Sequence, residues 1–235
     1  MARPKRKSQF ALSGKRPSGV RDERKFYLIV TEGKTEAQYF THFRSTTGPR
    51  ILSVDKQDSK VSLVKKAIAL RDQLKKEDSY IDEDETWAVF DRDVDKKKSN
   101  DKATFNQALE LAKNNGIEVA YSNDSFELWF LLHFQVASTA IHRKDIGTKL
   151  KEYLKSYKHG DDVFDQIKDK YTEAVKRAKQ MLKSANDAGT QPVDANPSTT
   201  VHLLTDKLLK DSDQQDLSLW LLNYGPGQMA LYKKI

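Results

Sequence analysis

Cysteine is absent from this sequence, which excludes a disulfide framework, a thiolate zinc site and a cysteine nucleophile. Long apolar runs are absent as well. The most apolar stretch, residues 128–134, is far shorter than a bilayer span, and no apolar segment follows the basic N-terminus as it would in a secretory signal. We therefore expect a protein that does not enter the membrane, and the lack of cysteine suits a reducing cytoplasm.

Charged side chains are abundant and unbalanced. They make up 32% of the 235 residues, with 41 Lys and Arg against 34 Asp and Glu, for a formal net charge of +7. This excess favours an anionic partner, with nucleic acid the first candidate and an anionic membrane surface the second. Residues 1–25 hold nine basic residues against two acids. Such an arm is either a disordered, solubilising extension or a segment that follows a phosphate backbone and folds on binding.

From residue 26 onward, strand patterns alternate with helix patterns. Short β-rich runs at residues 26–31, 50–54, 86–90 and 117–121 predict four strands. Apolar residues at helical spacing predict helices over residues 34–45, 61–76, 104–114 and 126–134, the third of which should stop near Gly116. This alternation is typical of an α/β fold, with a largely parallel sheet and helices on both faces.

Beyond about residue 140 the strand patterns disappear. Helices are predicted over residues 144–157, 164–184, 199–210 and 217–222, with a polar loop at 185–197 and Ser198 as an N-cap. We therefore expect three parts. They are a basic flexible arm (1–25), an α/β domain (26–140) and a C-terminal helical subdomain (141–235) packed on it.

Acidic residues follow three of the predicted strands. Glu32 follows the first strand, and Asp91 and Asp93 follow the third. The fourth strand ends near Asp124, and Glu127 lies about one helical turn later. Because ligands of open parallel sheets bind beyond the C-terminal ends of the strands, we expect these side chains at one edge of the sheet.

The Asp91-x-Asp93 pair is the most informative of these features. Two carboxylates two residues apart, leaving a buried strand, can share Mg²⁺ or Mn²⁺, a hard ion that prefers one or two carboxylates plus water and a substrate phosphate. A polar turn is the alternative, because Asp is common in turns. Glu32 alone could serve only to favour a helix N-terminus. Beside the Asp pair, we expect it to complete the metal site or to transfer a proton.

Basic side chains near these acids are candidates for nucleic-acid contacts. Lys34, Arg92, Lys96 and Lys97 border the expected site. The alternative is a solvated charge run, and Arg92 would point away from its two neighbours if the strand continued. His133, beside the apolar stretch, is either a packed histidine or a residue near the phosphate.

A nucleotide-binding loop is excluded by the sequence around Gly33. Gly33-Lys34-Thr35 resembles the end of a P-loop, but that loop needs a glycine five residues before Gly33 so that backbone amides can wrap the phosphates. Leu28 occupies that position, inside the predicted strand.

Four segments of the chain resemble the RloB-like family of bacterial and archaeal defence loci. They are FYLIVTEGKTEAQYF, WAVFDRDVD, VAYSNDSFELWFLLHF and NPSTTVHLL, spread over residues 26–204. A strand followed by Glu-Gly and a later strand followed by Asp-x-Asp also resemble the Toprim domain, a metal-binding fold of topoisomerases, primases and OLD-family nucleases. The resemblance implies a Toprim-like catalytic domain over residues 26–140. It implies that Glu32 acts as a general acid/base or binds the metal, that Asp91 and Asp93 bind the metal, and that Glu127 adds or orients a carboxylate.

The resemblance also implies a function. A topoisomerase would need a separate tyrosine domain and a primase would need nucleotide handling, so a hydrolytic nuclease is what remains. Related Toprim effectors in defence systems are thought to damage RNA. The expectation is therefore an endoribonuclease, with tRNA a plausible target and RNA favoured over DNA. Two rivals stay open: a non-catalytic nucleic-acid-binding module, and a subunit that docks a partner ATPase or another part of a defence complex. Homo-oligomerisation is open as well.

Overall fold

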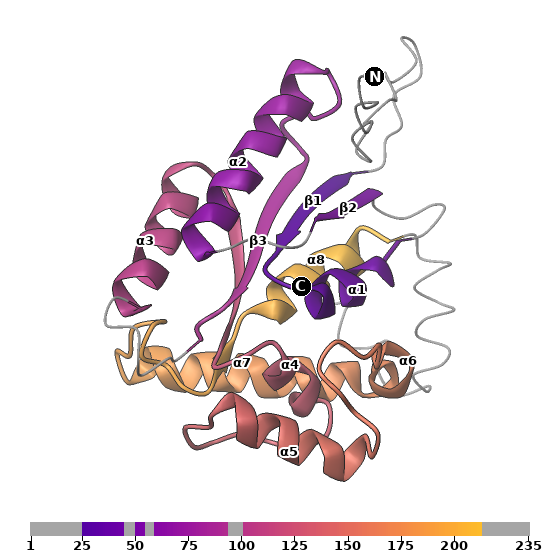
Figure 1. Ribbon diagram of the computed structural model, residues 1–235, viewed down its shortest axis with the longest axis vertical. Coiled ribbons are helices and arrows are strands. Elements are labelled where there is room, and N and C mark those ends of the chain that lie inside the picture. Colours follow the sequence, from indigo (N-terminus) through magenta and orange to yellow (C-terminus); the bar gives the residue numbers. More distant parts are fainter. Residues whose placement is uncertain (1–24, 45–49, 55–58, 94–100, 213–235) are drawn as a thin grey trace, which may run out of the picture.

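The computed structural model describes residues 25–44, 50–54, 59–93 and 101–212. These residues form a five-stranded sheet of order β2-β1-β3-β4-β5 (Figure 1). The four strands that pair in parallel are β1 (Phe26–Thr31), β2 (Arg50–Val54), β3 (Glu85–Asp91) and β4 (Glu118–Asn123). The predicted α/β fold is confirmed, with all four predicted strands in place.

The register of the sheet places the ends of three strands together. Thr31 of β1 is level with Val89 of β3, and Asp91 of β3 is level with Ser122 of β4. All six residues of β1 are buried, as expected of a strand covered on both faces. Residues that follow β1, β3 and β4 therefore leave the sheet at the same edge.

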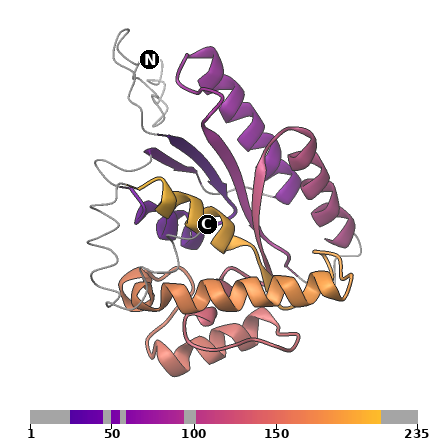
Figure 2. The ribbon, with the colours of Figure 1, turned by 180° about the vertical axis from the view of Figure 1, so that it is seen from behind.

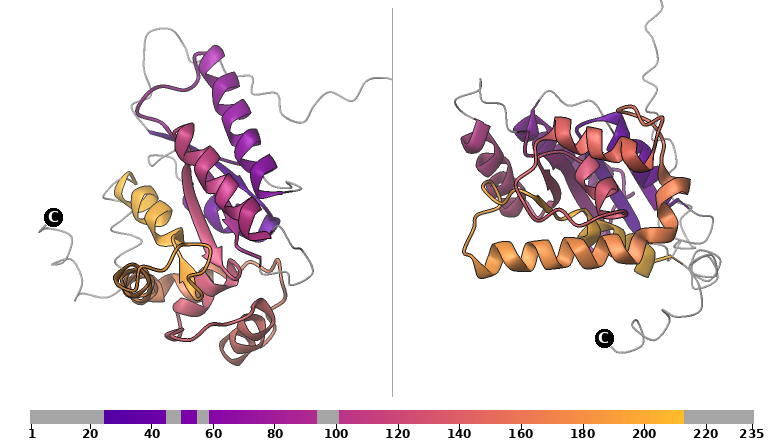
Figure 3. Two further views of the ribbon diagram at one scale, coloured as in Figure 1. Left: turned by 90° about the vertical axis from the view of Figure 1, so that its left-hand side faces the viewer. Right: turned by 90° about the horizontal axis from the view of Figure 1, so that it is seen from below.

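Helices cover both faces of the sheet. On one face, α2 (Lys60–Lys76) and α3 (Asp101–Asn114) pack over β1 and β3, where Leu28, Leu63 and Phe105 belong to one buried cluster. On the other face, α1 (Lys34–Thr41) and α8 (Val201–Lys210) share a second cluster with Tyr27 and Trp87. The left view of Figure 3 shows the strands between α8 and the α2–α3 pair.

The second cluster extends into the remaining helices. They are α4 (Glu127–Leu132), α5 (Arg143–Tyr153), α6 (Phe164–Ile167) and α7 (Tyr171–Asp187). In Figure 1, α4, α5 and α7 lie below the lower ends of β3 and β4, and Figure 2 shows α7 running across the molecule from behind. The right view of Figure 3 shows α4 between α5 and α7. Among the described residues, no helix has the length and apolarity needed to cross a membrane.

Two details of the C-terminal half differ from the prediction. The helix predicted over residues 164–184 is divided into α6 and α7 by a 3₁₀ turn, Lys168–Lys170. The division lets Phe164 stack on His42, with ring centroids 4.3 Å apart, while Tyr171 bonds to Thr205 of α8. The predicted helix at residues 217–222 lies outside the described residues, as does the basic arm except for Lys25.

A fifth strand follows residue 140, so the expectation of helices alone there was wrong. β5 (Ser198–Thr199) pairs antiparallel with β4, and Thr199 Oγ1 lies 2.9 Å from Ser122 Oγ. Ser198 is a buried strand residue rather than an N-cap, and α8 begins after Thr200. Two residues are too few to produce an alternating pattern, which is why the sequence does not predict this strand.

Candidate functional site

Glu32 and Asp91 meet at the ends of β1 and β3. The Asp91 backbone N–H donates to Glu32 Oε2 over 3.1 Å, and the Glu32 backbone N–H donates to the Val89 carbonyl over 3.1 Å. The Glu32 side chain is 25% exposed and the Asp91 side chain 14%. The structure thus brings the acid after the first strand to the acid after the third, at an edge that solvent reaches.

Asp93 lies beside Asp91, and one cation contacts both. Asp93 has a φ of 53°, in the left-handed region that Asp tolerates better than most residues, and its N–H donates to the Asp124 carbonyl over 3.2 Å. Arg143, the first residue of α5, pairs with the Asp93 carboxylate, and its Nη2 lies 3.2 Å from Asp91 Oδ2. The two acids of the Asp-x-Asp motif therefore face the same position.

Two further groups hold these acids in place. The fully buried Asp124 fixes the start of α5, because its Oδ2 accepts from the Arg143 backbone N–H over 3.0 Å. Lys60, the first residue of α2, has its Nζ 3.9 Å from Glu32 Oε1 and 3.7 Å from Asp93 Oδ2, and its side chain is only 8% exposed. Basic residues from two helices thus reach the acids that follow the strands.

Glu36 belongs to the same group of acids, although the motifs did not single it out. It lies in the first turn of α1 and is 6% exposed. Burial and then the carboxylates of Glu127 and Glu32 raise its pKa from 4.5 to about 7. A Cβ added to Gly33 would lie 2.9 Å from Glu36 Oε2, so the missing side chain at Gly33 gives this carboxylate its room. The sequence signal was an acid in the first helical turn after a strand end.

Glu127 joins the group from the start of α4. Its Oε1 accepts from the Tyr157 hydroxyl over 3.2 Å and from His159 Nδ1 over 2.6 Å. Burial alone would raise the pKa of Glu127, but the hydrogen bond from His159, the Ser125 hydroxyl and the Glu127 backbone N–H together outweigh it, and the pKa falls to about 2. The bond to Glu127 also raises the pKa of His159. Glu127 is therefore ionised at neutral pH and adds a permanent negative charge.

The acids disfavour one another's ionisation. Burial, followed by the carboxylates of Glu36, Glu127 and Glu32, raises the pKa of Asp91 well above its usual value, and Arg143 opposes this. Burial also raises the pKa of Glu32 against the effect of Lys60. Crowded carboxylates of this kind gain from a nearby divalent cation, which becomes the largest local charge in a site. We call Glu32, Glu36, Asp91, Asp93 and Glu127 the carboxylate cluster.

The side chains of the carboxylate cluster are of the type that binds a hard cation, but they are not arranged around a common position for one. No three His, Asp or Glu side chains within the described ranges are positioned as a ready metal site. Lys60 and Arg143 lie among the acids and pair with them. The donors are carboxylate oxygens, which suit Mg²⁺ and Mn²⁺. Asp91 and Asp93 could hold such an ion, with Glu32 beside them, once Arg143 withdraws.

Comparison with known proteins addresses the family of the chain. A family model described as RloB-like protein matches residues 27–208, a range that includes the whole carboxylate cluster and Arg143. The chain belongs to the RloB-like family. No curated protein and no solved structure matches it. The resemblance drawn from four sequence segments is thus confirmed at the level of the family.

Two of the nucleic-acid contacts expected for this RloB-like chain are wrong. Arg92 is 3% exposed, its Nε donates to the Val193 carbonyl over 3.1 Å, and its guanidinium pairs with Asp101. His133 is 2% exposed, its Nδ1 donates to the Trp129 carbonyl over 2.9 Å, and burial lowers its pKa to about 3. Both side chains are fixed inside the fold and do not reach a ligand at the surface.

The structure describes only one of the three remaining basic candidates, Lys34. Lys34 is exposed at the first residue of α1, two residues after Glu32, and its contact with a phosphate stays a prediction. Lys96 and Lys97 lie outside the described residues. Lys60, Arg143 and His159 were not expected. They approach the cluster through the packing of helices, which no local motif records.

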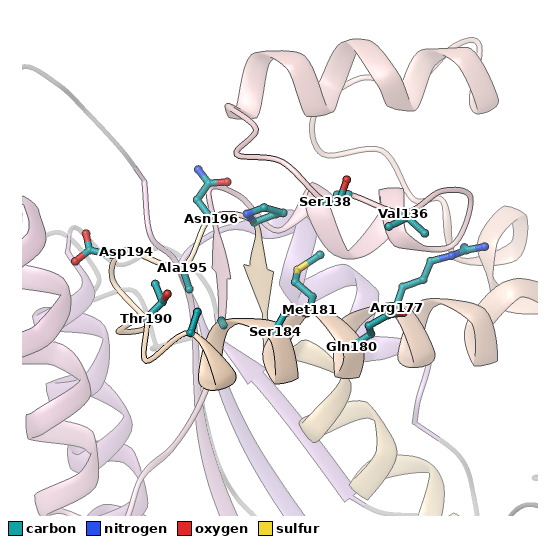
Figure 4. A pocket seen from close by; sticks show the side chains of 14 residues that line it. Val136, Ser138, Arg177, Gln180, Met181, Ser184, Thr190, Asp194, Ala195 and Asn196 are labelled. Carbon is teal, nitrogen blue, oxygen red and sulfur yellow. The ribbon is translucent and has the colours of Figure 1, made fainter.

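A separate pocket lies between α7 and the segment before α5 (Figure 4). It has a volume of about 390 Å³ and is bordered by Ser138 on one side, by Arg177 and Met181 of α7 on another, and by Asn196. Asn196 Oδ1 accepts from the Ile141 N–H over 3.0 Å, two residues before Arg143. None of the cluster carboxylates lines the pocket, so it is distinct from the candidate site.

Proposed function

We propose that this RloB-like protein is a metal-dependent nuclease that hydrolyses phosphodiester bonds in RNA. The observation that carries the proposal is the carboxylate cluster, in which acids from two strand ends and two helix starts are grouped, and burial together with neighbouring carboxylates raises the pKa of Glu32, Glu36 and Asp91. Perturbed carboxylates grouped at the ligand-binding edge of a parallel sheet are typical of a catalytic site.

A purely structural role explains the cluster poorly. An acid that serves stability is usually paired or hydrogen-bonded so that its ionised form is favoured. Asp91, Glu32 and Glu36 have raised pKa values instead, so their charged forms are disfavoured where they lie. Proteins often keep such unfavourable arrangements where activity needs them.

In the proposed mechanism Asp91 and Asp93 hold Mg²⁺ or Mn²⁺, with Glu32 and Glu127 alongside. The bound ion supplies Lewis acidity, polarising a phosphoryl oxygen and offsetting charge that develops in the transition state. Glu32 transfers a proton, either from the attacking water or to the leaving oxygen, and burial, which raises its pKa, makes this carboxylate a stronger base than an exposed glutamate. Arg143, half-exposed, exchanges its aspartates for a substrate phosphate.

RNA as substrate and antiphage defence as the setting belong to the same proposal. Membership in the RloB-like family supports them through the resemblance to Toprim effectors that damage RNA, with tRNA a plausible target. The net charge of +7 supports a polyanionic substrate without distinguishing RNA from DNA.

The test is cleavage by the purified full chain. Total RNA, plasmid and single-stranded DNA would each be incubated with Mg²⁺ or Mn²⁺, and the product ends sequenced. We expect RNA products that vanish in EDTA and in Asp91→Ala. The matched control is Asp72→Ala, an exposed acid of α2 whose one ion pair among the described residues is with the neighbouring Arg71, and this variant should cleave like the wild type. Cleavage by Asp91→Ala with saturating metal would refute the assignment.

One observation favours a second candidate, a non-catalytic nucleic-acid-binding module. Lys60 and Arg143 already pair with the acids that would hold the metal. This candidate predicts RNA binding that survives both EDTA and Asp91→Ala, with no product in any metal. A Mg²⁺-dependent product that is lost in Asp91→Ala excludes it.

A further inference from the structure

The segment of residues 143–159, which contains α5 and the loop after it, contacts the carboxylate cluster at both of its ends. At its first residue, Arg143 contacts Asp91 and Asp93. Just beyond the end of α5, the Tyr157 hydroxyl and His159 Nδ1 both donate to Glu127. Exposed lysines lie directly beside both attachment points, Lys144 after Arg143 and Lys158 before His159.

The exposed surface of this segment is strongly positive. Residues 143–159 contain six Lys or Arg and two acids. All five lysines are exposed, and none forms an ion pair with an acid in the described parts of the chain: they are Lys144, Lys149, Lys151, Lys155 and Lys158. On α7, by contrast, Arg177 pairs with Glu173, Lys179 with Asp206 and Lys183 with Asp187. The charge of α5 is therefore uncompensated, whereas much of that on α7 is balanced.

Most of the charges on α5 are also sorted by side, with Lys149, about 40° from Asp145 around the axis, as the exception. Residues seven apart on a helix lie within about 20° of each other around the axis, so Lys144 and Lys151 form one stripe and Asp145 and Glu152 another. Arg143 lies about 100° to one side of the lysine stripe and the acids about 100° to the other. The positive stripe thus lies between Arg143, the residue that contacts the cluster, and the acidic stripe.

We infer that the positive stripe of α5, Lys144 and Lys151, together with Lys155 just after the helix, binds the phosphate backbone of the RNA and guides it to the carboxylate cluster. The inference rests on the proposed function and names the surface that recognises its substrate. Lysines act here as point charges that neutralise phosphates and release counterions, so they would add affinity without sequence preference. Arg143 would receive the phosphate that comes nearest to Asp91 and Asp93.

The test is binding, measured apart from cleavage. Fluorescence anisotropy of a short fluorescein-labelled single-stranded RNA would be followed in EDTA, from about 50 to 200 mM salt. The variant carries Lys144→Gln, Lys151→Gln and Lys155→Gln together. Three lost contacts to single-stranded nucleic acid should reduce the salt slope of log affinity by about 2, and the affinity near 0.1 M salt on the order of 100-fold.

The matched control removes the same charge at the opposite edge of the sheet. Lys76 and Lys113 lie in the last turns of α2 and α3, before β3 and β4, and Lys210 ends α8 next to Asp211, which accepts from the Tyr27 hydroxyl. All three are exposed. The triple Lys→Gln control should keep the wild-type slope, and circular dichroism on both triples shows whether they are folded.

The outcomes separate this inference from the proposed function. An α5 variant that binds like the wild type, or a control that loses as much as the α5 variant, overturns the inference even if the protein cleaves RNA. A selective loss of binding in the α5 variant supports the inference even if the wild type cleaves nothing in Mg²⁺ or Mn²⁺. In that case the nuclease proposal alone fails.

Discussion

Asp91→Asn should abolish cleavage while making the metal-free protein more stable. The Asp91 carboxylate is 14% exposed, and its pKa is raised by burial and by Glu36, Glu127 and Glu32. Because the pKa of this carboxylate is higher in the folded than in the unfolded protein, keeping it ionised at neutral pH opposes folding. The cost is about 1.4 kcal/mol for each pKa unit of difference between the two states. Asn has the same shape and no charge, so it removes this opposition.

The net effect follows from what the substitution takes away. The pair with Arg143, which is 42% exposed, contributes about 0–1 kcal/mol. We expect the relief of the buried charge to exceed this, so that both the free energy of unfolding and the Tm of Asp91→Asn rise above those of the wild type. Urea unfolding in EDTA at pH 7, followed by tryptophan fluorescence, measures this free energy.

A second acid supplies the contrast. Asp101 pairs with Arg92, which is 3% exposed, so Asp101→Asn leaves a buried cation without its partner and should lower stability by about 3–5 kcal/mol. Mg²⁺ at about 100 times its Kd should stabilise the wild type by about 2.7 kcal/mol and leave Asp91→Asn unchanged. If Asp91→Asn unfolds more easily than the wild type in EDTA, by an amount like that of Asp101→Asn, then Asp91 is a structural ion-pair partner and the reasoning is refuted.

Three further predictions concern other parts of the molecule. Gly33→Ala should lower kcat by about tenfold or more, because the added Cβ displaces the end of the Glu36 side chain. It should cost less than about 1 kcal/mol of stability, because the Gly33 φ of −132° suits any residue. Cleavage rates measure the first effect and urea unfolding the second. Glu127→Gln should weaken the Mg²⁺-induced rise in Tm, because it removes a carboxylate that is ionised at neutral pH. His133 has a folded pKa of about 3, below its unfolded value of about 6.5, so its stabilising effect is complete above pH 6.5 and is lost on acidification. Between pH 7 and pH 5 the wild type should lose about 2 kcal/mol more than His133→Asn, by urea unfolding at each pH.

Each of these has an outcome that contradicts it. Unchanged kcat in Gly33→Ala would mean that the position of the Glu36 carboxylate does not matter to catalysis. An undiminished Mg²⁺ response in Glu127→Gln would place Glu127 outside the metal's influence. Parallel stability curves for the wild type and His133→Asn between pH 7 and pH 5 would show that His133 is not held neutral by burial.

The fold was predictable because its signals are local. The apolar run at β1 and the alternation of strand and helix patterns reflect burial on both faces of a parallel sheet, which leaves its mark in consecutive residues. β5 left no such mark, since only two residues pair. The break between α6 and α7 depends on what each half packs against, and that information lies in other parts of the chain.

The same distinction applies to the candidate site. Glu32, Asp91 and Asp93 could be placed together because parallel strands end at one edge, a rule that needs only strand order. Arg143 comes to the cluster from about 50 residues along the chain, through the packing of α5, and no spacing rule connects it with Asp91. The sequence left His133 open between a packed histidine and a residue near the phosphate, because its place in the sequence shows nothing of the Trp129 carbonyl that accepts its hydrogen bond.

Arg143 has two roles: its backbone N–H anchors the start of α5 to Asp124, and its guanidinium pairs with Asp91 and Asp93. An anion that draws this guanidinium away exposes the aspartates to a cation, and a cation seated there releases the guanidinium for an anion. By thermodynamic reciprocity each ligand then tightens the other's binding by the same factor. In the proposed nuclease, this one arginine would therefore couple the binding of substrate to the binding of metal, and it would stay paired with Asp91 and Asp93 while both ligands are scarce.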